Sequence, residues 1–235
     1  MSAAGVIDTR RLGRLALRAA AALALAYILL PLFFVTWLSF FRQEIPTFPP
    51  EGYSLRWYLA APGEERFVQG FKLSLQVGLL ATVIGLALGV PAALALTRGR
   101  LPGAGLLANT LLLPLAVPGV VLGVAIYVFH VEAEIQTQWP ILGSFAGLVG
   151  AHALLVIPWT VRLITASLEG LDRSVEEAAQ SLGANRLVTF RRVTLPAILP
   201  GVVASTLFGL VASFSNLEMR LFLVGPGRTT LPIAI

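Results

Sequence analysis

Residues that could do chemistry are sparse in this sequence, and they are concentrated between Asp172 and Pro196. The 235 residues include 12 Asp and Glu, 17 Lys and Arg, two His and no Cys. A thiol nucleophile, a disulfide and a thiolate metal site are therefore excluded. His130 and His152 lack the ligand spacing of a metal site, so packing or boundary roles are favoured. No catalytic constellation is present, and we expect neither an enzyme nor a bound cofactor.

The polar stretch begins with residues that specify a short helix. Ser174, followed by Glu177 three residues later, has the form of a capping box. Glu176 and Glu177 suit the positive end of a helix dipole, and Gly183 can end the helix with a positive φ. An apolar stripe at helical spacing is formed by Val175, Ala178, Ala179 and Leu182. The pattern predicts a small-residue docking face, although a helix packed on the ends of its neighbours would show it too.

A second group of polar residues is scattered within apolar sequence. Charged groups inside a membrane are costly and often functional. Glu218 and Arg220 lie late in the last apolar run, two residues apart, so they do not share a helix face. Each of these polar residues either lines a solute pathway or lies at a boundary or a helix contact. The candidate pathway residues are Asn109, Ser213, Asn216, Glu218 and Arg220.

The long apolar runs that carry these residues have the length of membrane spans. Helices are favoured, because backbone polar groups must be satisfied within each segment. A cleavable signal peptide is the alternative for the first run. However, the apolar core of a signal peptide is only about 7–15 residues long, and this run is longer. We therefore expect an all-α bundle of five spans, with a sixth absent. They are Ala19–Phe41, Leu73–Thr97, a run within Leu101–Val131 interrupted by Pro114 and Pro118, Ile141–Val161 and Ala197–Val224.

Charge is sparse and placed at the ends of these runs. The chain is 57% hydrophobic and 12% charged, whereas soluble domains carry about 25% charged residues. The net charge of +5 comes mainly from arginines beside apolar runs, a pattern that orients spans rather than binds nucleic acid. We expect a cytoplasmic N-terminus over residues 1–18 and a single transmembrane domain over 19–235. Its cytoplasmic loop spans 169–196, and a short external surface helix is expected near Leu55–Leu59.

The cytoplasmic loop resembles the signature loop of bacterial binding-protein-dependent ABC importer permeases. The match begins at Glu177-Ala178-Ala179 and continues with Gly183 after a gap of three residues. Val193 follows after nine more residues and Leu195-Pro196 after one more, with valine in place of the usual isoleucine. The resemblance implies a coupling helix seated in a groove of a cytoplasmic ATPase, within a helix bundle of the type I importer kind. The residues that it assigns to coupling are Ser174, Val175, Glu177, Ala178, Ala179, Leu182 and Gly183.

The same resemblance implies partners and a location. These are an ATPase dimer, a second permease subunit and an extracytoplasmic solute-binding protein, in the bacterial inner membrane. A heterodimer of permeases is favoured over a homodimer. The typical core of the family has six spans, and the sixth would follow Pro232.

Further stretches resemble the polyamine-type branch of this family. They are Leu113 to Gly123, Ser213-Phe214, Leu221 to Gly227 and Thr229 to Pro232. The resemblance implies a polyamine such as spermidine or putrescine, with ferric iron or a phosphonate as the alternative. The branch usually carries acidic residues after the Ser-Phe pair, but this chain has Ser215 and Asn216 there. Glu218 follows two residues later, and the departure argues against a polycation site supplied by this chain.

Two other classes of membrane protein fit the sequence less well than an importer permease. A self-contained secondary transporter predicts several intramembrane ionisable residues or inverted repeats, and the first four spans have almost none. A membrane scaffold would not require the coupling loop. The sequence has no G-x-x-x-x-G-K-[ST] phosphate loop, so any ATP hydrolysis must come from a partner.

Overall fold

The computed structural model describes residues 9–99, 101–225 and 230–234, and their regular elements are helices apart from an isolated bridge between Phe41 and Tyr53. The chain divides into two units, Met1–Glu64 and Glu65–Ile235, and each is considered by itself. Within the described residues, five helices are long and apolar enough to cross a membrane, which confirms the predicted all-α architecture. These spans are Gly13–Leu38, Glu65–Arg98, Gly119–Thr137, Phe145–Glu169 and Arg186–Phe214.

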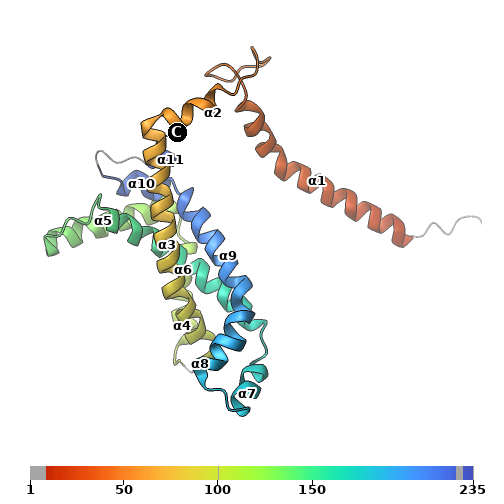
Figure 1. The fold of residues 1–235 in the computed structure, drawn as a ribbon, viewed down its shortest axis with the longest axis vertical. Coiled ribbons are helices and arrows are strands. Elements are labelled where there is room, and N and C mark those ends of the chain that lie inside the picture. Colours follow the sequence, from red (N-terminus) through yellow and green to blue (C-terminus); the bar gives the residue numbers. More distant parts are fainter. Residues whose placement is uncertain (1–8, 100, 226–229, 235) are drawn as a thin grey trace, which may run out of the picture. The chain divides into compact units, whose positions relative to one another are not determined.

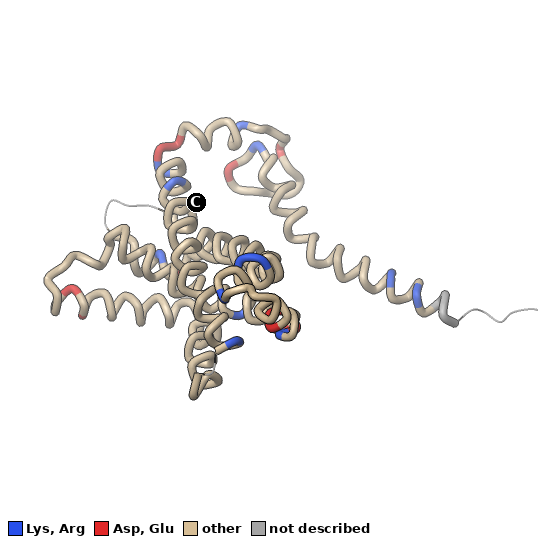
Figure 2. Tube along the Cα trace, turned by 60° about the horizontal axis from the view of Figure 1, so that its bottom comes forward, with Lys and Arg blue, Asp and Glu red and all other residues tan. Residues whose placement is uncertain are grey.

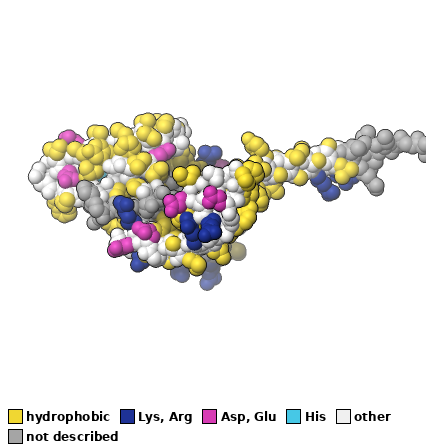
Figure 3. All heavy atoms as spheres, turned by 90° about the horizontal axis from the view of Figure 1, so that it is seen from above, with side chains coloured by type: hydrophobic (Ala, Val, Ile, Leu, Met, Phe, Trp, Pro, Cys, Tyr) yellow, Lys and Arg dark blue, Asp and Glu magenta, His cyan; other side chains and the backbone are white. Residues whose placement is uncertain are grey.

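The first unit consists of α1 (Thr9–Leu38), α2 (Arg56–Ala60), a 3₁₀ turn (Ala61–Gly63) and the segment between α1 and α2. Within this unit no residue of the span in α1 is buried, and many side chains on the face of this helix seen in Figure 3 are hydrophobic. The connecting segment is held by backbone bonds, from Arg42 N–H to Gly52 O and from Ser54 N–H to Phe40 O. α2 coincides with the predicted surface helix. The apolar surface of α1 is suited to contact lipid or another chain.

Three long helices form the core of the second unit: α3 (Glu65–Arg98), α6 (Phe145–Glu169) and α9 (Leu195–Phe214). Figure 1 shows them running beside one another, with α7 and α8 gathered at one end and α10 and α11 near the other. The shorter elements are α4 (Ala104–Leu112), a 3₁₀ turn (Leu113–Leu115), α5 (Gly119–Thr137), α7 (Arg173–Ser181), α8 (Arg186–Thr189), a π-helical segment (Phe190–Thr194), α10 (Glu218–Leu223) and α11 (Leu231–Ala234).

Small residues allow the three core helices to approach closely. A Cβ atom at Gly85 of α3 would lie 2.4 Å from Cγ1 of Val156, and one at Gly209 of α9 would lie 2.6 Å from the same atom. One turn further along, a Cβ at Gly89 would lie 2.7 Å from Cβ of Thr160. Val156 and Thr160 of α6 are both fully buried. Contact of this kind is what holds helices together in a membrane, where lipid is as apolar as the side chains.

Charged residues, coloured along the chain trace in Figure 2, gather near the beginning of α1 and around the helix ends and connections, and long stretches between them carry none. This distribution agrees with the predicted spans. Their limits differ from those predicted, because α3 begins at Glu65 and α6 continues to Glu169. In both helices the helical backbone continues beyond the apolar run that was used to predict the span. The added helix ends carry charged residues.

The third and fifth predicted spans are interrupted. Pro118 has an extended ψ of 137°, so the third run divides into α4, a 3₁₀ turn and α5. His130 lies buried inside α5. α9 ends at Phe214, where Ser215 Oγ donates to Val211 O and Asn216 Oδ1 accepts from Met219 N–H. Such side-chain bonds compete with the helix ladder. The placement of Glu218 and Arg220 late in the fifth span was therefore wrong, because both lie in α10.

Gly85 provides a test of the close packing. We expect Gly85→Ala to lower stability by about 1–3 kcal/mol, because the added methyl group must displace a buried, stiff valine. Gly150→Ala in α6 is the control, since nothing lies within 4 Å of its Cβ position. The measurement is the temperature at which detergent-solubilised protein loses its monodisperse peak in size-exclusion chromatography. Equal melting of the two variants would contradict the packing described.

Candidate functional site

The helix predicted from the polar loop is α7, and its first residue differs from the expectation. Asp172 is the N-cap, and its Oδ1 accepts the Ser174 N–H at 2.9 Å. The capping box assigned to Ser174 and Glu177 was wrong, because α7 begins at Arg173 and Ser174 is already helical. Asp caps a helix as well as Ser does. The hydrogen bonds from Ser174, first from its backbone and then from its side chain, hold the pKa of Asp172 below its ordinary value of 3.8.

The other end of α7 is closed as predicted. Gly183 has a φ of 91°, its N–H donates to Gln180 O, and Ala184 N–H donates to Ala179 O. This pair of bonds is the Schellman motif, in which a residue with positive φ satisfies the last carbonyls of a helix. Both ends of α7 are therefore fixed by local bonds, with no help from a partner.

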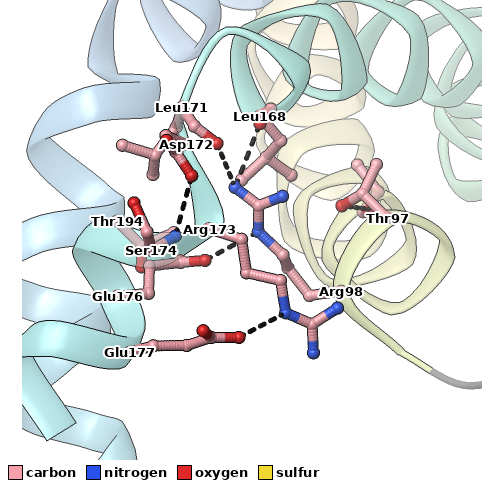
Figure 4. Close-up of polar contacts among 11 residues, drawn as sticks. Thr97, Arg98, Leu168, Leu171, Asp172, Arg173, Ser174, Glu176, Glu177 and Thr194 are labelled. Atoms are coloured by element: carbon pink, nitrogen blue, oxygen red, sulfur yellow. Dashed lines mark hydrogen bonds and ion pairs between the residues drawn. The ribbon is translucent and has the colours of Figure 1, made fainter. Parts of the chain in front are cut away.

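The predicted stripe on α7 faces solvent. The exposed fraction is 48% for Val175 and 89% for Leu182. Ala178 is exposed, and Ala179 is half-buried. Glu177 is also exposed, and its only described ion pair is with Arg173 Nε at 3.4 Å on the same helix (Figure 4). The alternative that this stripe packs on the ends of the spans is therefore not what the structure shows.

Glu176, the neighbour of Glu177, points to the other side of α7 and is buried. Its Oε2 lies 2.7 Å from Arg98 Nε, at the end of α3, and its Oε1 accepts from the Thr194 hydroxyl. The Arg98 Nε–H has no hydrogen-bond geometry with an acceptor, so this contact acts through charge. The sequence drew attention to Glu176 only through the helix dipole, and Arg98 was one of the arginines that flank the apolar runs.

Arg98 also closes the end of α6. Its Nη2 donates to Leu168 O at 3.0 Å and to Leu171 O at 2.8 Å (Figure 4). Carbonyls at the end of a helix have no partner within it, and a cation there is favourable. One arginine therefore joins the ends of α3 and α6 to α7.

Beside these residues lies an open hollow of about 830 Å³, bounded by Arg98, Arg173, Glu176 and Phe190 among others.

A second polar cluster surrounds Arg220, which is fully buried. Its guanidinium donates to Ser74 Oγ of α3, to Ser213 O at 2.7 Å and to His152 Nε2 at 3.3 Å. His152 Nδ1 lies 2.9 Å from Leu148 O, an arrangement that assigns the proton to Nδ1 and leaves Nε2 as the acceptor. In the part of the chain that the structure describes, no carboxylate pairs with Arg220.

The candidate pathway residues do not form one site. Ser213 and Arg220 lie together, and Asn216 Oδ1 accepts from the Met219 N–H in the first turn of α10. Glu218 is exposed, with its carboxylate against Gly119. Asn109 is exposed on α4, away from α10 along the bundle (Figure 1). The described residues contain no group of three His, Cys, Asp or Glu that could hold a metal ion.

Comparison with known proteins identifies the class of membrane protein that this helix bundle and its cytoplasmic loop define. Residues 82–235 match the family described as the binding-protein-dependent transport system inner membrane component. This match covers more than half of the chain, and the chain therefore belongs to that family. It is a membrane component of a transport system and not an enzyme.

Two relatives and one solved structure illustrate the similarity. The chain is 32% identical over 185 residues to the putrescine transport system permease protein PotI of Escherichia coli K12, covering 78% of this chain and 66% of that protein. It is 30% identical over 222 residues to PhnV of Salmonella paratyphi A, named for 2-aminoethylphosphonate transport, covering 93% and 82%. A bacterial ABC transporter that imports alginate matches with a TM-score of 0.69 at 17% identity, over 99% of this chain and 80% of that one. The last likeness shows the shared fold.

The cap of α7 provides a second test. We expect Asp172→Ala to lower amide protection over α7 several-fold at pH 7, whereas Asp172→Asn keeps the acceptor and the protection. Because the folded pKa is lowered, the cap contributes fully above pH 3.8 and its contribution falls only as the pH drops through the lowered pKa. Asp172→Asn should remove that dependence on pH. Hydrogen–deuterium exchange of α7 peptides measures both effects, and unchanged protection in Asp172→Ala would contradict the assignment.

Proposed function

We propose that this chain is one permease subunit of an ABC importer, forms half of a solute pathway and is driven through α7 by a separate cytoplasmic ATPase dimer. The observation that carries the proposal is the solvent-facing stripe of α7, on a helix whose two ends are fixed by its own chain. A helix with exposed apolar side chains and preformed ends is suited to bind a groove, because little order has to be gained on docking.

The stripe has the chemistry of a docking face. Burial of an exposed leucine such as Leu182 contributes about 1.5–3 kcal/mol. Ala178 and Ala179 allow the backbone of α7 to approach its partner closely. Glu177 can exchange its exposed pair with Arg173 for a basic group of the ATPase at little cost, because exposed ion pairs contribute little.

The remaining assignments concern topology and partners. Residues 1–18 and the loop 169–196 lie in the cytoplasm, and 19–235 form the permease domain. A second permease subunit, different from this one, completes the pathway, and an extracytoplasmic binding protein delivers the solute. The location is the bacterial inner membrane.

The proposed solute is a polyamine such as putrescine or spermidine, supported by the similarity to PotI. A phosphonate is the second candidate, and Arg220 favours it. A buried cation without a described carboxylate partner attracts an anionic group that comes near it and repels a polycation. Ser215 and Asn216 add no negative charge beside it, and Glu218, two residues away on α10, is exposed.

Ligand binding to the cognate solute-binding protein tests the choice of solute. Calorimetry on putrescine, spermidine, ferric iron and 2-aminoethylphosphonate should show binding of a polyamine if the first candidate is correct. Binding of the phosphonate alone selects the second. If no member of the panel binds, both substrate assignments are wrong.

Charge reversal at Glu177 tests the docking face. We expect Glu177→Arg to reduce solute uptake and co-purification with the ATPase by about tenfold or more, because it places a cation against a basic partner group. Glu169→Arg is the matched control, an exposed glutamate at the end of α6 outside the stripe. Retention of the ATPase by Glu177→Arg, with normal uptake, would falsify the docking role.

A further inference from the structure

We infer that Arg98 and Glu176 form a joint that transmits movement of α7 to the ends of α3, α6 and α9, with Glu176 acting as a positioning residue for transport. The inference rests on the proposed docking of α7 on an ATPase. It assigns adjacent glutamates to different tasks: Glu177 faces the partner, and Glu176 faces the chain's own membrane helices.

The contacts of α7 lead to this inference. Among the residues described, Glu176 is the only member of α7 whose side chain makes a hydrogen bond or an ion pair with another helix of the chain. The other described ion pair of α7, between Arg173 and Glu177, lies within the helix. Beyond the chain connections at its two ends, the polar attachment of α7 to the bundle therefore passes through one carboxylate.

The other side of the joint is attached to a packed core. Arg98 holds the carbonyl of Leu168, and Leu168 is fully buried in a cluster with Ala93, Ile164 and Ile198. This cluster contains residues from all three core helices, α3, α6 and α9. Because packed interiors transmit displacement instead of absorbing it, a pull on Arg98 reaches these helices together.

Thr194 gives the joint its connection to α9. It ends the π-helical segment Phe190–Thr194, and Pro196 two residues later has no N–H to complete a normal helical ladder. π-helical turns inside helices often occur at functional sites. The bond from Thr194 to Glu176 therefore attaches α7 to the π-helical segment that leads directly into α9.

The burial of the ion pair between Arg98 and Glu176 suits a contact that holds when α7 is pulled and can also break. The side chains of Arg98 and Glu176 are 22% and 11% exposed, compared with 54% and 68% for Arg173 and Glu177. The attraction between Arg98 and Glu176 is therefore the stronger of the two, because water and salt screen it less. The hollow beside it leaves room for the two side chains to move as α7 tilts.

Reconstituted transporter provides the test, with three measurements on each variant: ATPase co-purified, ATP hydrolysed and solute transported. We expect Glu176→Gln to retain the ATPase and to lower the solute moved per ATP by about five- to tenfold. Arg98→Gln should have a similar effect, and the double variant should be no worse than either single one, because both remove the same contact. Arg192→Gln, an exposed arginine of the π-helical segment, is the control and should behave as wild type.

Thr194→Val is the second variant, because it keeps the shape of the side chain and the ion pair but removes the bond to Glu176. It should lower the same ratio, and it decides the inference if Glu176→Gln does not fold. If either folded variant transports the normal amount of solute per ATP hydrolysed, the inferred role of the joint is wrong. Loss of the ATPase from Glu176→Gln overturns it too, because Glu176 would then serve docking. Failure of the wild-type chain to hold an ATPase is a different result, which would overturn the proposed function.

Discussion

Val156 is the point at which α3, α6 and α9 meet, with glycine on both neighbouring helices. In a membrane the hydrophobic effect does not favour helix contact over lipid contact, so shape has to hold the bundle together. The glycines at 85 and 209 provide that shape, because each removes the side chain that would keep the helices apart. The distances between the ends of the same helices follow from this contact. Arg98 can reach the end of α6, and Thr194 can reach Glu176, only because the three helices are close.

The two polar clusters lie on either side of this packed region. His152 precedes Val156 by one turn of α6 and bonds Arg220, whereas Leu168 lies three turns beyond it and accepts from Arg98. The Arg220 cluster satisfies the carbonyl of Ser213, which lipid could not do. Arg98 satisfies the carbonyls of Leu168 and Leu171 at the end of α6. The bundle is thus packed through small residues in its middle and joined through arginines towards both ends. An arginine suits both places, because its several donors can join different helices at once.

The sequence was sufficient where the determining signals are local. Five spans, the α7 helix and the positive φ of Gly183 follow from run length, helical spacing and the need for glycine at a Schellman turn. The end of α9 was missed, because Ser215 and Asn216 redirect the backbone with side-chain bonds that apolar composition does not register. The two clusters were missed for another reason. Arg220 and Ser74 are 146 residues apart in the chain, so only the packing of the helices brings them together.

The adjacent glutamates of α7 show where sequence reasoning needs the structure. Successive residues of a helix point about 100° apart, so one of the two carboxylates must face away from the other's partner. Spacing identified a stripe but did not say which side of α7 the bundle occupies. The structure places the bundle on the side of Glu176, which leaves Glu177 and Leu182 exposed. A docking helix needs this division, because without an attachment on its inner side only the chain connections at its two ends would carry its movement to the membrane helices.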